Sequence, residues 1–353
     1  YPLYLWHWPL LSFSHIIANG DPGTAQKTLI VLVSFILSWL TYHYWENPFR
    51  RNKSAWHVVV LVVLMGLVGV TGRLVQKSHG YPGRFPHTIR NIAKFPYSYS
   101  HAKSYRLGIC FVDAKSQGAD DFSEECLEPA KSKSKKVFLW GDSHAAHLYP
   151  GLKHYEKEGL FRVIQFTAGG CPPVMNADIA ERPLCKPINH KVLDLIKETA
   201  PDVVVMAASW TDDAEAWNYT GLDALSDTIA ALKNFGIEEI VLVGPVPAWS
   251  GSAPKTLVKF SQQNNWQDPP DRLASGFAKD IRNLDTTIEA IALKNGVSYI
   301  SPYRTFCNAE GCLAKIEGVP TSFDCCHLSD IGSVFLIKSN LDKISHSLRL
   351  PHP

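Results

Sequence analysis

Between residues 137 and 300 the chain repeatedly alternates a short apolar run with a longer segment of helical periodicity. The apolar runs are expected to be strands, at 137–140, 162–166, 203–207, 239–244 and 298–300. Helices are expected between and after them, at 144–157, 187–199, 221–235, 275–295 and 330–348. Continuous apolar strands separated by helices are typical of a parallel sheet covered on both faces. The pattern therefore predicts a three-layer α/β domain.

The first 75 residues differ in composition, because they are largely apolar and aromatic. Three membrane-spanning helices are expected there, at 3–18, 28–45 and 57–72. The first is short for a span of about 20 residues. Since the chain starts with Tyr1 rather than Met, we expect a fragment that lacks its earlier membrane helices. The basic residues Arg50, Arg51 and Lys53 follow the second span, so the positive-inside rule predicts a cytoplasmic loop there and a periplasmic C-terminal part.

All eight cysteines follow the membrane segments, at positions 110, 126, 171, 185, 307, 312, 325 and 326. An even number within a soluble region suggests an oxidising compartment, which agrees with a periplasmic location. Nearest-neighbour pairing predicts the disulfides 110–126, 171–185 and 307–312, although sequence does not fix the connectivity and reduced, buried cysteines are the alternative. The net charge of +2 gives no indication of a nucleic-acid partner.

A candidate nucleophile follows the first strand, in the segment VFLWGDSH (137–144). Ser143 stands where the strand turns into a helix, at the edge where open α/β sheets bind ligands. Serine needs a base, and the segment DCCHL (324–328) offers His327 as general base and acid, with Asp324 to hold its tautomer. A serine that only forms a turn and a histidine that only caps a helix are the structural alternatives. Asp142 is expected to fix the turn.

The Gly-Asp-Ser and Asp-x-x-His-Leu blocks resemble those of the SGNH (GDSL-like) hydrolase and acyltransferase family. The segment YPLYLWHWPL (1–10) is similar to a late transmembrane helix of the membrane acyltransferase-3 family, and YHYWENP (42–48) resembles the Glu-x-Pro close of such a helix. Together they resemble proteins in which the two domains are fused. The resemblance implies helices of a truncated acyltransferase-3 domain at 1–75, a periplasmic linker at 76–130, and an SGNH-like catalytic domain at 131–353.

An oxyanion hole needs N–H donors aimed at the developing charge. The backbone N–H of Ser143 is one candidate, and Gly169 and Gly170 after the second strand are the others. The segment GGCPP (169–173) resembles the glycine block of the fused family, while a glycine needed only for a tight turn is the alternative. Many SGNH enzymes carry an asparagine after the third strand, where this chain has Ser209 and Trp210. These two residues are candidates for a third donor or for a wall of the acceptor site.

Several other chemistries are not indicated by the sequence. The adjacent Cys325 and Cys326, with Cys307 and Cys312, match no standard zinc spacing, so no metal site is expected. The chain has no Gly-x-Ser-x-Gly elbow, Gly-x-Gly-x-x-Gly or P-loop, and we therefore expect no bound nucleotide cofactor.

The resemblance implies an O-acyltransferase of the inner membrane, multi-pass, with a periplasmic C-terminal domain. Its acyl donor is expected to be acetyl-CoA, used at the membrane domain, and its acceptor a hydroxyl of a cell-surface polysaccharide such as lipopolysaccharide, reached through an acyl-serine. A carbohydrate esterase that uses the same Ser-His-Asp triad is one alternative. A non-catalytic, membrane-anchored glycan-binding module is the other.

Overall fold

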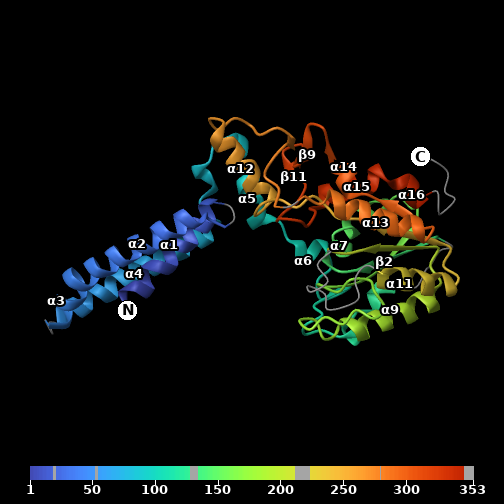
Figure 1. Ribbon diagram of the computed structural model, residues 1–353, viewed down its shortest axis with the longest axis horizontal. Coiled ribbons are helices and arrows are strands. Elements are labelled where there is room, and N and C mark those ends of the chain that lie inside the picture. Colours follow the sequence, from blue (N-terminus) through green and yellow to red (C-terminus); the bar gives the residue numbers. More distant parts are fainter. Residues whose placement is uncertain (19–20, 52–54, 128–133, 211–222, 279, 346–353) are drawn as a thin grey trace. The chain divides into compact units, whose positions relative to one another are not determined.

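The computed structural model describes the chain except for residues 19–20, 52–54, 128–133, 211–222, 279 and 346–353 (Figure 1). It divides into two compact units, Tyr1–Lys94 and Phe95–Pro353. The boundary lies within α5 (His87–Ser98). Each unit is described separately.

The first unit is built from helices, most of which are apolar. They are α1 (Pro2–Ala18), α2 (Thr24–Thr41), α3 (Asn47–Arg51) and α4 (Ala55–Lys77), with a π-helical turn at Tyr42–Glu46. Helix α1 packs along α2. Two helical stretches, Thr24–Arg51 and Trp56–Lys77, are long and apolar enough to cross a membrane. They match the second and third expected spans, whereas α1 has 17 residues, fewer than the roughly 20 of a typical crossing.

The second unit is organised around a parallel six-stranded sheet with the strand order β1-β3-β2-β4-β5-β7. The strands are β1 (Phe111–Val112), β2 (Lys136–Gly141), β3 (Arg162–Ala168), β4 (Val203–Ala207), β5 (Glu239–Val243) and β7 (Ser298–Ile300). Because the strands are parallel, their carboxyl ends all lie at one edge of the sheet.

Helices cover both faces of the sheet, as the uninterrupted apolar strands predict. On one face Phe138 and Trp140 of β2 pack in a core with α9 (Cys185–Thr199), α11 (Asp223–Asn234) and α13 (Arg282–Lys294). On the other face Val137 and Leu139 pack with residues of α8 (Tyr149–Lys157), α15 (Asp330–Ser339) and α16 (Leu341–Ser345). The three-layer α/β prediction is confirmed.

Small antiparallel elements follow the main sheet. They are β6 (Arg272–Leu273), β8 (Cys307–Asn308) and β9 (Gly311–Leu313) in one sheet, and β10 (Lys315–Ile316) with β11 (Val319–Pro320) in another. Short helices complete the unit at α6 (His101–Ser104), α7 (Ser143–Ala146), α12 (Ala253–Gln263) and α14 (Pro302–Phe306).

All five predicted strands are present, but several expected elements differ in detail. The helix expected at 144–157 is divided into α7 and α8, and the one expected at 330–348 into α15 and α16, with 346–348 outside the described residues. Helix α12 lies between the fourth and fifth expected strands, in a segment for which the sequence predicted no helix. Strand β1 lies within the expected linker 76–130, so the sheet begins before residue 131.

The three predicted disulfides, Cys110–Cys126, Cys171–Cys185 and Cys307–Cys312, are all formed. Cys325 and Cys326, left without partners in the prediction, are bonded to each other. The Cys110–Cys126 disulfide flanks β1 and therefore ties the edge of the sheet to the segment that follows β1.

Candidate active site

The turn from β2 into α7 is shaped by Gly141 and Asp142. Gly141 has φ +146°, and a Cβ there would lie 1.8 Å from the carbonyl oxygen of Ala207 on β4, so this backbone path requires glycine. The buried carboxylate of Asp142 caps α7 by accepting the His144 N–H at 2.7 Å. Its other oxygen accepts the Ser209 N–H at 2.9 Å, which ties the ends of β2 and β4 together. The prediction that Asp142 fixes the turn is confirmed.

Asp142 combines burial with several hydrogen bonds. Burial raises its pKa to about 6, although the N–H groups of Ser209 and His144 act in the opposite direction by favouring the ionised form. Each of its two carboxylate oxygens accepts a backbone N–H, from His144 and from Ser209. Asp142 is therefore a structural group of the turn.

The structure brings Ser143, His327 and Asp324 into one chain of hydrogen bonds. Nε2 of His327 lies 2.8 Å from Oγ of Ser143, and Nδ1 lies 2.8 Å from Oδ2 of Asp324. The serine and the histidine are 184 residues apart in sequence. Their contact satisfies the geometric requirement for a nucleophile with its base and the group that orients the base.

The hydrogen-bond partners fix the tautomer of the neutral imidazole. An ionised carboxylate only accepts hydrogen bonds, so Nδ1 of His327 carries the proton and Nε2 is left to accept from the Ser143 hydroxyl. Burial alone would raise the pKa of Asp324, but the hydrogen bond and charge of His327 and two backbone N–H groups hold it below its usual value. Asp324 is therefore ionised at neutral pH.

The oxygens of Asp324 have separate tasks. Oδ2 faces the imidazole, while Oδ1 accepts the backbone N–H groups of Cys326 at 3.0 Å and His327 at 2.8 Å. Oδ1 thus holds the loop closed, and Oδ2 orients the imidazole of His327.

Two further histidines lie against His327. The His144 ring centre is 4.8 Å and the His147 ring centre 6.3 Å from that of His327. Burial, and the charges of His144 and His327, hold the pKa of His147 well below its ordinary value, so it is neutral. Its Nδ1 accepts the N–H of Leu328 at 3.5 Å.

The loop that carries His327 is also held from the start of the second unit. The hydroxyl of Tyr105 donates to the carbonyl of Leu328 at 2.6 Å, and Phe323 stacks on the His327 ring. Sequence reasoning did not identify Tyr105, His144 or His147. The repeated histidines of SHAAH (143–147) were a visible signal, whereas nothing near Tyr105 indicates a partner 223 residues away.

The two candidate oxyanion glycines are not equivalent. Gly169 donates its N–H to the carbonyl of Val112 at 2.8 Å, which extends the β1–β3 pairing. Gly170 has φ +66° at the second central position of a turn closed by the Cys171 N–H and the Ala168 carbonyl. Among the described residues, no hydrogen bond is formed by the backbone N–H of Ser143 or of Gly170. These two N–H groups are the available donors.

Trp210 does not form the expected wall. It is 2 % exposed, and its indole N–H donates to the carbonyl of Val243 at 2.7 Å, so it belongs to the core. Ser209 is exposed, and its backbone N–H is already bonded to Asp142. Only the hydroxyl of Ser209 is left as a candidate contact for an acceptor.

Asp324, Cys326 and His327 have ligand atoms close enough together to hold an ion. The chemistry of this set does not fit a metal, because Sγ of Cys326 is bonded to Cys325 and is no thiolate. Asp324 and Nδ1 of His327 are also bonded to one another. The same groups fit proton transfer instead.

A family model described as SGNH domain (fused to AT3 domains) matches residues 109–339. No curated protein sequence matches the chain. Among solved structures, the chain is similar to the periplasmic domain of the lipopolysaccharide acetyltransferase of Salmonella ser. Paratyphi A. The two are 27% identical with a TM-score of 0.62, over 73% of this chain and 99% of that one.

Two further solved structures show weaker similarity. The acetyl xylan esterase AlAXEase is 16% identical with a TM-score of 0.36, over 61% of this chain and 98% of that one. TesA is 13% identical with a TM-score of 0.35, over 60% of this chain and 99% of that one. At these TM-scores neither similarity supports an inference.

Proposed function

This chain belongs to the family of SGNH domains that are fused to AT3 domains, and on that premise we propose that it is an O-acetyltransferase of a cell-surface polysaccharide. Family membership and the similarity to the Salmonella periplasmic domain support an acetyltransferase or esterase role. The observation that carries the proposal is the hydrogen-bonded chain from Ser143 through His327 to Asp324.

In the first step the Ser143 hydroxyl attacks the acyl carbonyl of the donor. Nε2 of His327 accepts the hydroxyl proton as the C–O bond forms, and Asp324 stabilises the resulting imidazolium. The imidazolium then returns the proton to the leaving group, so that an acetyl-serine remains. General-base assistance of this kind contributes about 10²–10⁴-fold to the rate.

The tetrahedral intermediate carries a negative oxygen that needs donors. The backbone N–H groups of Ser143 and Gly170 are proposed for this role, since the Gly169 N–H is occupied. The hydroxyl of Ser209 is a further candidate on the β4 side. A single donor of such a hole is worth about 10²–10³ in kcat.

In the second step a sugar hydroxyl occupies the place that the leaving group has vacated. His327 accepts the proton of that hydroxyl while the sugar oxygen attacks the acetyl-serine. His327 then protonates the departing Ser143 oxygen. If water takes the place of the sugar, the same groups release acetate. Esterase activity is therefore the second candidate, and the specific reason is that nothing in the triad itself selects a sugar over water.

The proposal includes a location and a donor. The two helices able to cross a membrane and the disulfides of the second unit support a multi-pass inner-membrane protein with a periplasmic C-terminal unit. Acetyl-CoA is proposed as the donor substrate there, and the polysaccharide as acceptor in the periplasm.

The test is to detect the covalent intermediate and follow its fate. The full chain in detergent is mixed with 4-nitrophenyl acetate, and intact-protein and peptide mass spectrometry locate the acetyl group. We expect an adduct on Ser143 that is absent from Ser143→Ala, with Ser339→Ala, an exposed serine at the end of α15, as the matched control that keeps the adduct. When oligosaccharides are added, the acetyl group should be transferred to the sugar instead of being released to water as acetate. An unmodified Ser143 would refute both enzymatic functions. Acetate as the sole product would exclude the transferase and leave esterase activity as the function.

A further inference from the structure

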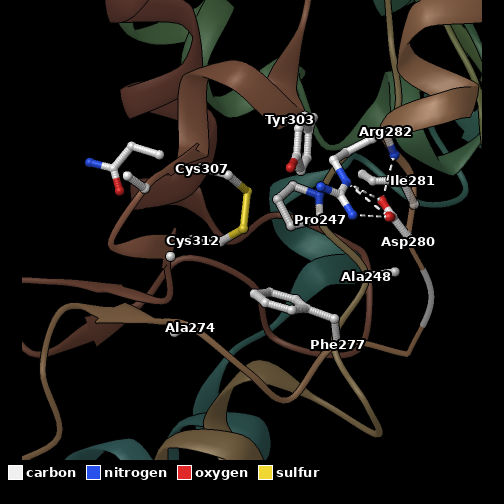
Figure 2. A pocket seen from close by; sticks show the side chains of 13 residues that line it. Pro247, Ala248, Ala274, Phe277, Asp280, Ile281, Arg282, Tyr303, Cys307 and Cys312 are labelled. Carbon is white, nitrogen blue, oxygen red and sulfur yellow. Dashed lines mark hydrogen bonds and ion pairs between the residues drawn. A yellow bond between two sulfur atoms is a disulfide. The ribbon is translucent and has the colours of Figure 1, made fainter.

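A cavity lies at the same edge of the sheet as Ser143, beyond the carboxyl ends of β5 and β7. Its volume is about 430 Å³, within the roughly 300–1,000 Å³ of small-molecule sites. Figure 2 shows the rings of Tyr303 and Phe277 on opposite sides, with the Cys307–Cys312 disulfide and Pro247 between them. Asp280 and Arg282 stand together at one end.

The polar groups at that end form a matched pair. The guanidinium of Arg282 donates to both carboxylate oxygens of Asp280, with Nε at 2.9 and 2.8 Å. The hydrogen bonds from Arg282 lower the pKa of Asp280 to about 2, so the pair stays ionised. Both side chains are more than half exposed. The pair therefore offers donors and acceptors to a ligand while its net charge is zero.

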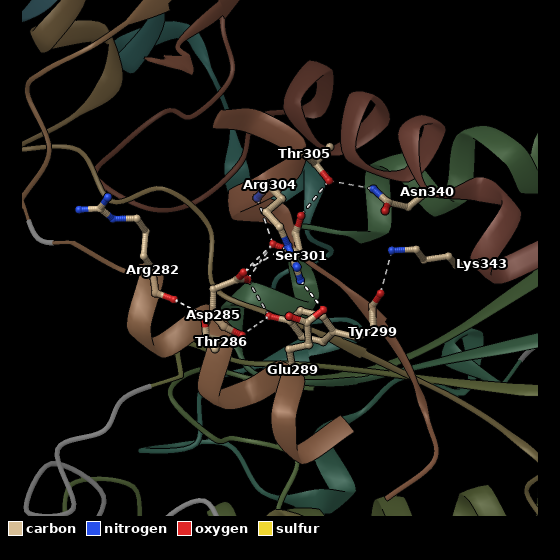
Figure 3. Close-up of polar contacts among 10 residues, drawn as sticks. All are labelled: Arg282, Asp285, Thr286, Glu289, Tyr299, Ser301, Arg304, Thr305, Asn340 and Lys343. Carbon is tan, nitrogen blue, oxygen red and sulfur yellow. Dashed lines mark hydrogen bonds and ion pairs between the residues drawn. The ribbon is translucent and has the colours of Figure 1, made fainter. Parts of the chain in front are cut away.

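The walls of the cavity are held in place by a buried polar network (Figure 3). Asp285 accepts the hydroxyl of Ser301 at 2.8 and 2.9 Å and that of Tyr299 at 2.7 Å. Asp285 belongs to α13, whose first residue is Arg282, and Ser301 caps α14, which carries Tyr303. The network thus fixes the positions of these two lining residues relative to each other.

The third wall is a closed hairpin. Cys307 and Cys312 are paired across β8 and β9 and joined by their disulfide. Nη1 of Arg272 donates to the carbonyls of Phe306 at 2.6 Å and Gly311 at 3.1 Å, at the two ends of the hairpin. The cavity is therefore preformed, which lowers the entropic cost of binding.

One wall leads directly to the candidate catalytic loop. Ala248 lines the cavity, and the N–H of the next residue, Trp249, donates to the carbonyl of Cys325 at 2.7 Å. The Ala253 N–H donates to the carbonyl of Asp324 at 3.1 Å. Strand β5 is two places from β2, which corresponds to about 10 Å along the sheet edge. A ligand spanning both sites would be larger than one sugar ring.

We propose that this cavity is an acceptor subsite that binds an uncharged sugar residue of the polysaccharide, adjacent to the residue acetylated at Ser143. The inference rests on the proposed function. Aromatic faces suit the apolar faces of a pyranose ring, and the neutral Asp280–Arg282 pair suits its hydroxyls. Occupation of the cavity would place a neighbouring sugar hydroxyl before the acetyl-serine and favour it over water.

Other occupants fit the cavity less well. A fatty acyl chain would make no use of the hydrogen-bond donors and acceptors of the Asp280–Arg282 pair. An anionic sugar would find an arginine that is already neutralised by Asp280. An uncharged sugar uses both the two aromatic rings and the Asp280–Arg282 pair.

The test separates binding from turnover and uses the full chain in detergent. Binding of neutral mono- to tetrasaccharides of glucose, galactose, mannose and rhamnose to Ser143→Ala is followed by saturation-transfer NMR. Transfer from 4-nitrophenyl acetate to the same sugars is measured on chains that keep Ser143. Phe277→Ala and Tyr303→Ala should each lower transfer to the longer sugars by about 2- to 10-fold, and the double variant by at least about 5-fold. Acylation of Ser143 and transfer to monosaccharides should not change.

The matched control is Phe235→Ala. Phe235 is 36% exposed and lies in the turn before β5, at the edge of the sheet opposite the cavity, so its replacement should leave sugar binding, acylation and transfer unchanged. Tyr303→Phe keeps the ring and should behave like the unaltered chain, which guards against a folding defect. If no sugar binds, or if the double variant affects all acceptor lengths alike, the subsite is refuted. An unacylated Ser143 with normal sugar binding would refute the proposed function and leave the cavity as a sugar site.

Discussion

Replacing Asp324 with asparagine should inactivate the chain without unfolding it. The backbone N–H groups of Cys326 and His327 both bond to Oδ1, and an asparagine carbonyl oxygen can accept both of them. The amide nitrogen would then take the place of Oδ2, 2.8 Å from Nδ1 of His327. Because the amide nitrogen only donates, Nδ1 must become the acceptor and Nε2 must carry the proton. The imidazole would then point an N–H at Ser143 and could not accept its proton.

The expected loss follows from this inverted tautomer and from the missing carboxylate charge. A comparable substitution in a Ser-His-Asp triad lowers kcat by about 10⁴, and we expect a fall of about 10³–10⁴, or about 4–5.5 kcal/mol of transition-state stabilisation. The assay is the rate of Ser143 acetylation by 4-nitrophenyl acetate, read as the burst of 4-nitrophenol. Nitrogen NMR of labelled histidine should show the change of tautomer at His327.

The matched control is Asp330→Asn, which makes the same chemical change in the same unit. Asp330 accepts the hydroxyl of Tyr99 at 2.8 Å and takes no part in the triad, so its variant should acylate normally. An Asp324→Asn chain that keeps activity within about tenfold of the unaltered chain would contradict the assigned tautomer, since far more is expected from it. Unfolding of that variant would contradict the separate tasks of Oδ1 and Oδ2.

Three further predictions concern the stability of the second unit. Gly141→Ala should destabilise it by at least about 3 kcal/mol in thermal unfolding, because the added Cβ meets the Ala207 carbonyl at 1.8 Å; a normal melting temperature would contradict this. The raised pKa of Asp142, about 6 against about 3.9 in the unfolded chain, means that the folded state holds the extra proton. Stability should therefore fall by roughly 3 kcal/mol as pH rises from about 4 to 6, and Asp142→Asn, compared by denaturant unfolding across that range, should lack this fall. Replacing Cys110 and Cys126 together with serine should cost about 3 kcal/mol, the value for opening a loop of this length (16 residues); a double variant with unchanged denaturation midpoint would show that the bond is dispensable.

Much of the fold follows from short-range patterns. The apolar runs at 137–140, 203–207 and 239–244 admit few structures other than buried parallel strands, and each is present. Strand β1 escaped prediction because two residues, Phe111–Val112, carry no periodicity and form a strand only by pairing with β3. Helix α12 was missed because its polar sequence, APKTLVKFSQQ, resembles that of a surface loop.

The candidate site was predictable where the chemistry resides in residue type and order. A serine after Gly-Asp and a histidine three residues after an aspartate identified Ser143, Asp324 and His327, which the structure joins by hydrogen bonds. The direction of a side chain was not predictable, and Trp210 points into the core because the Val243 carbonyl accepts its N–H. The difference between Gly169 and Gly170 likewise depends on β1, which the sequence did not indicate.

Strand β1 has a consequence for handling this protein in solution. It pairs with β3 at Phe111–Thr167 and Val112–Ala168 and so covers the outer side of β3 at its carboxyl end. A shortened chain starting at residue 131 would uncover the backbone N–H groups of Thr167 and Gly169, which bond to this segment. Two such chains could then join edge to edge, and precipitation of the shortened protein would reflect the lost strand rather than a fault in its triad.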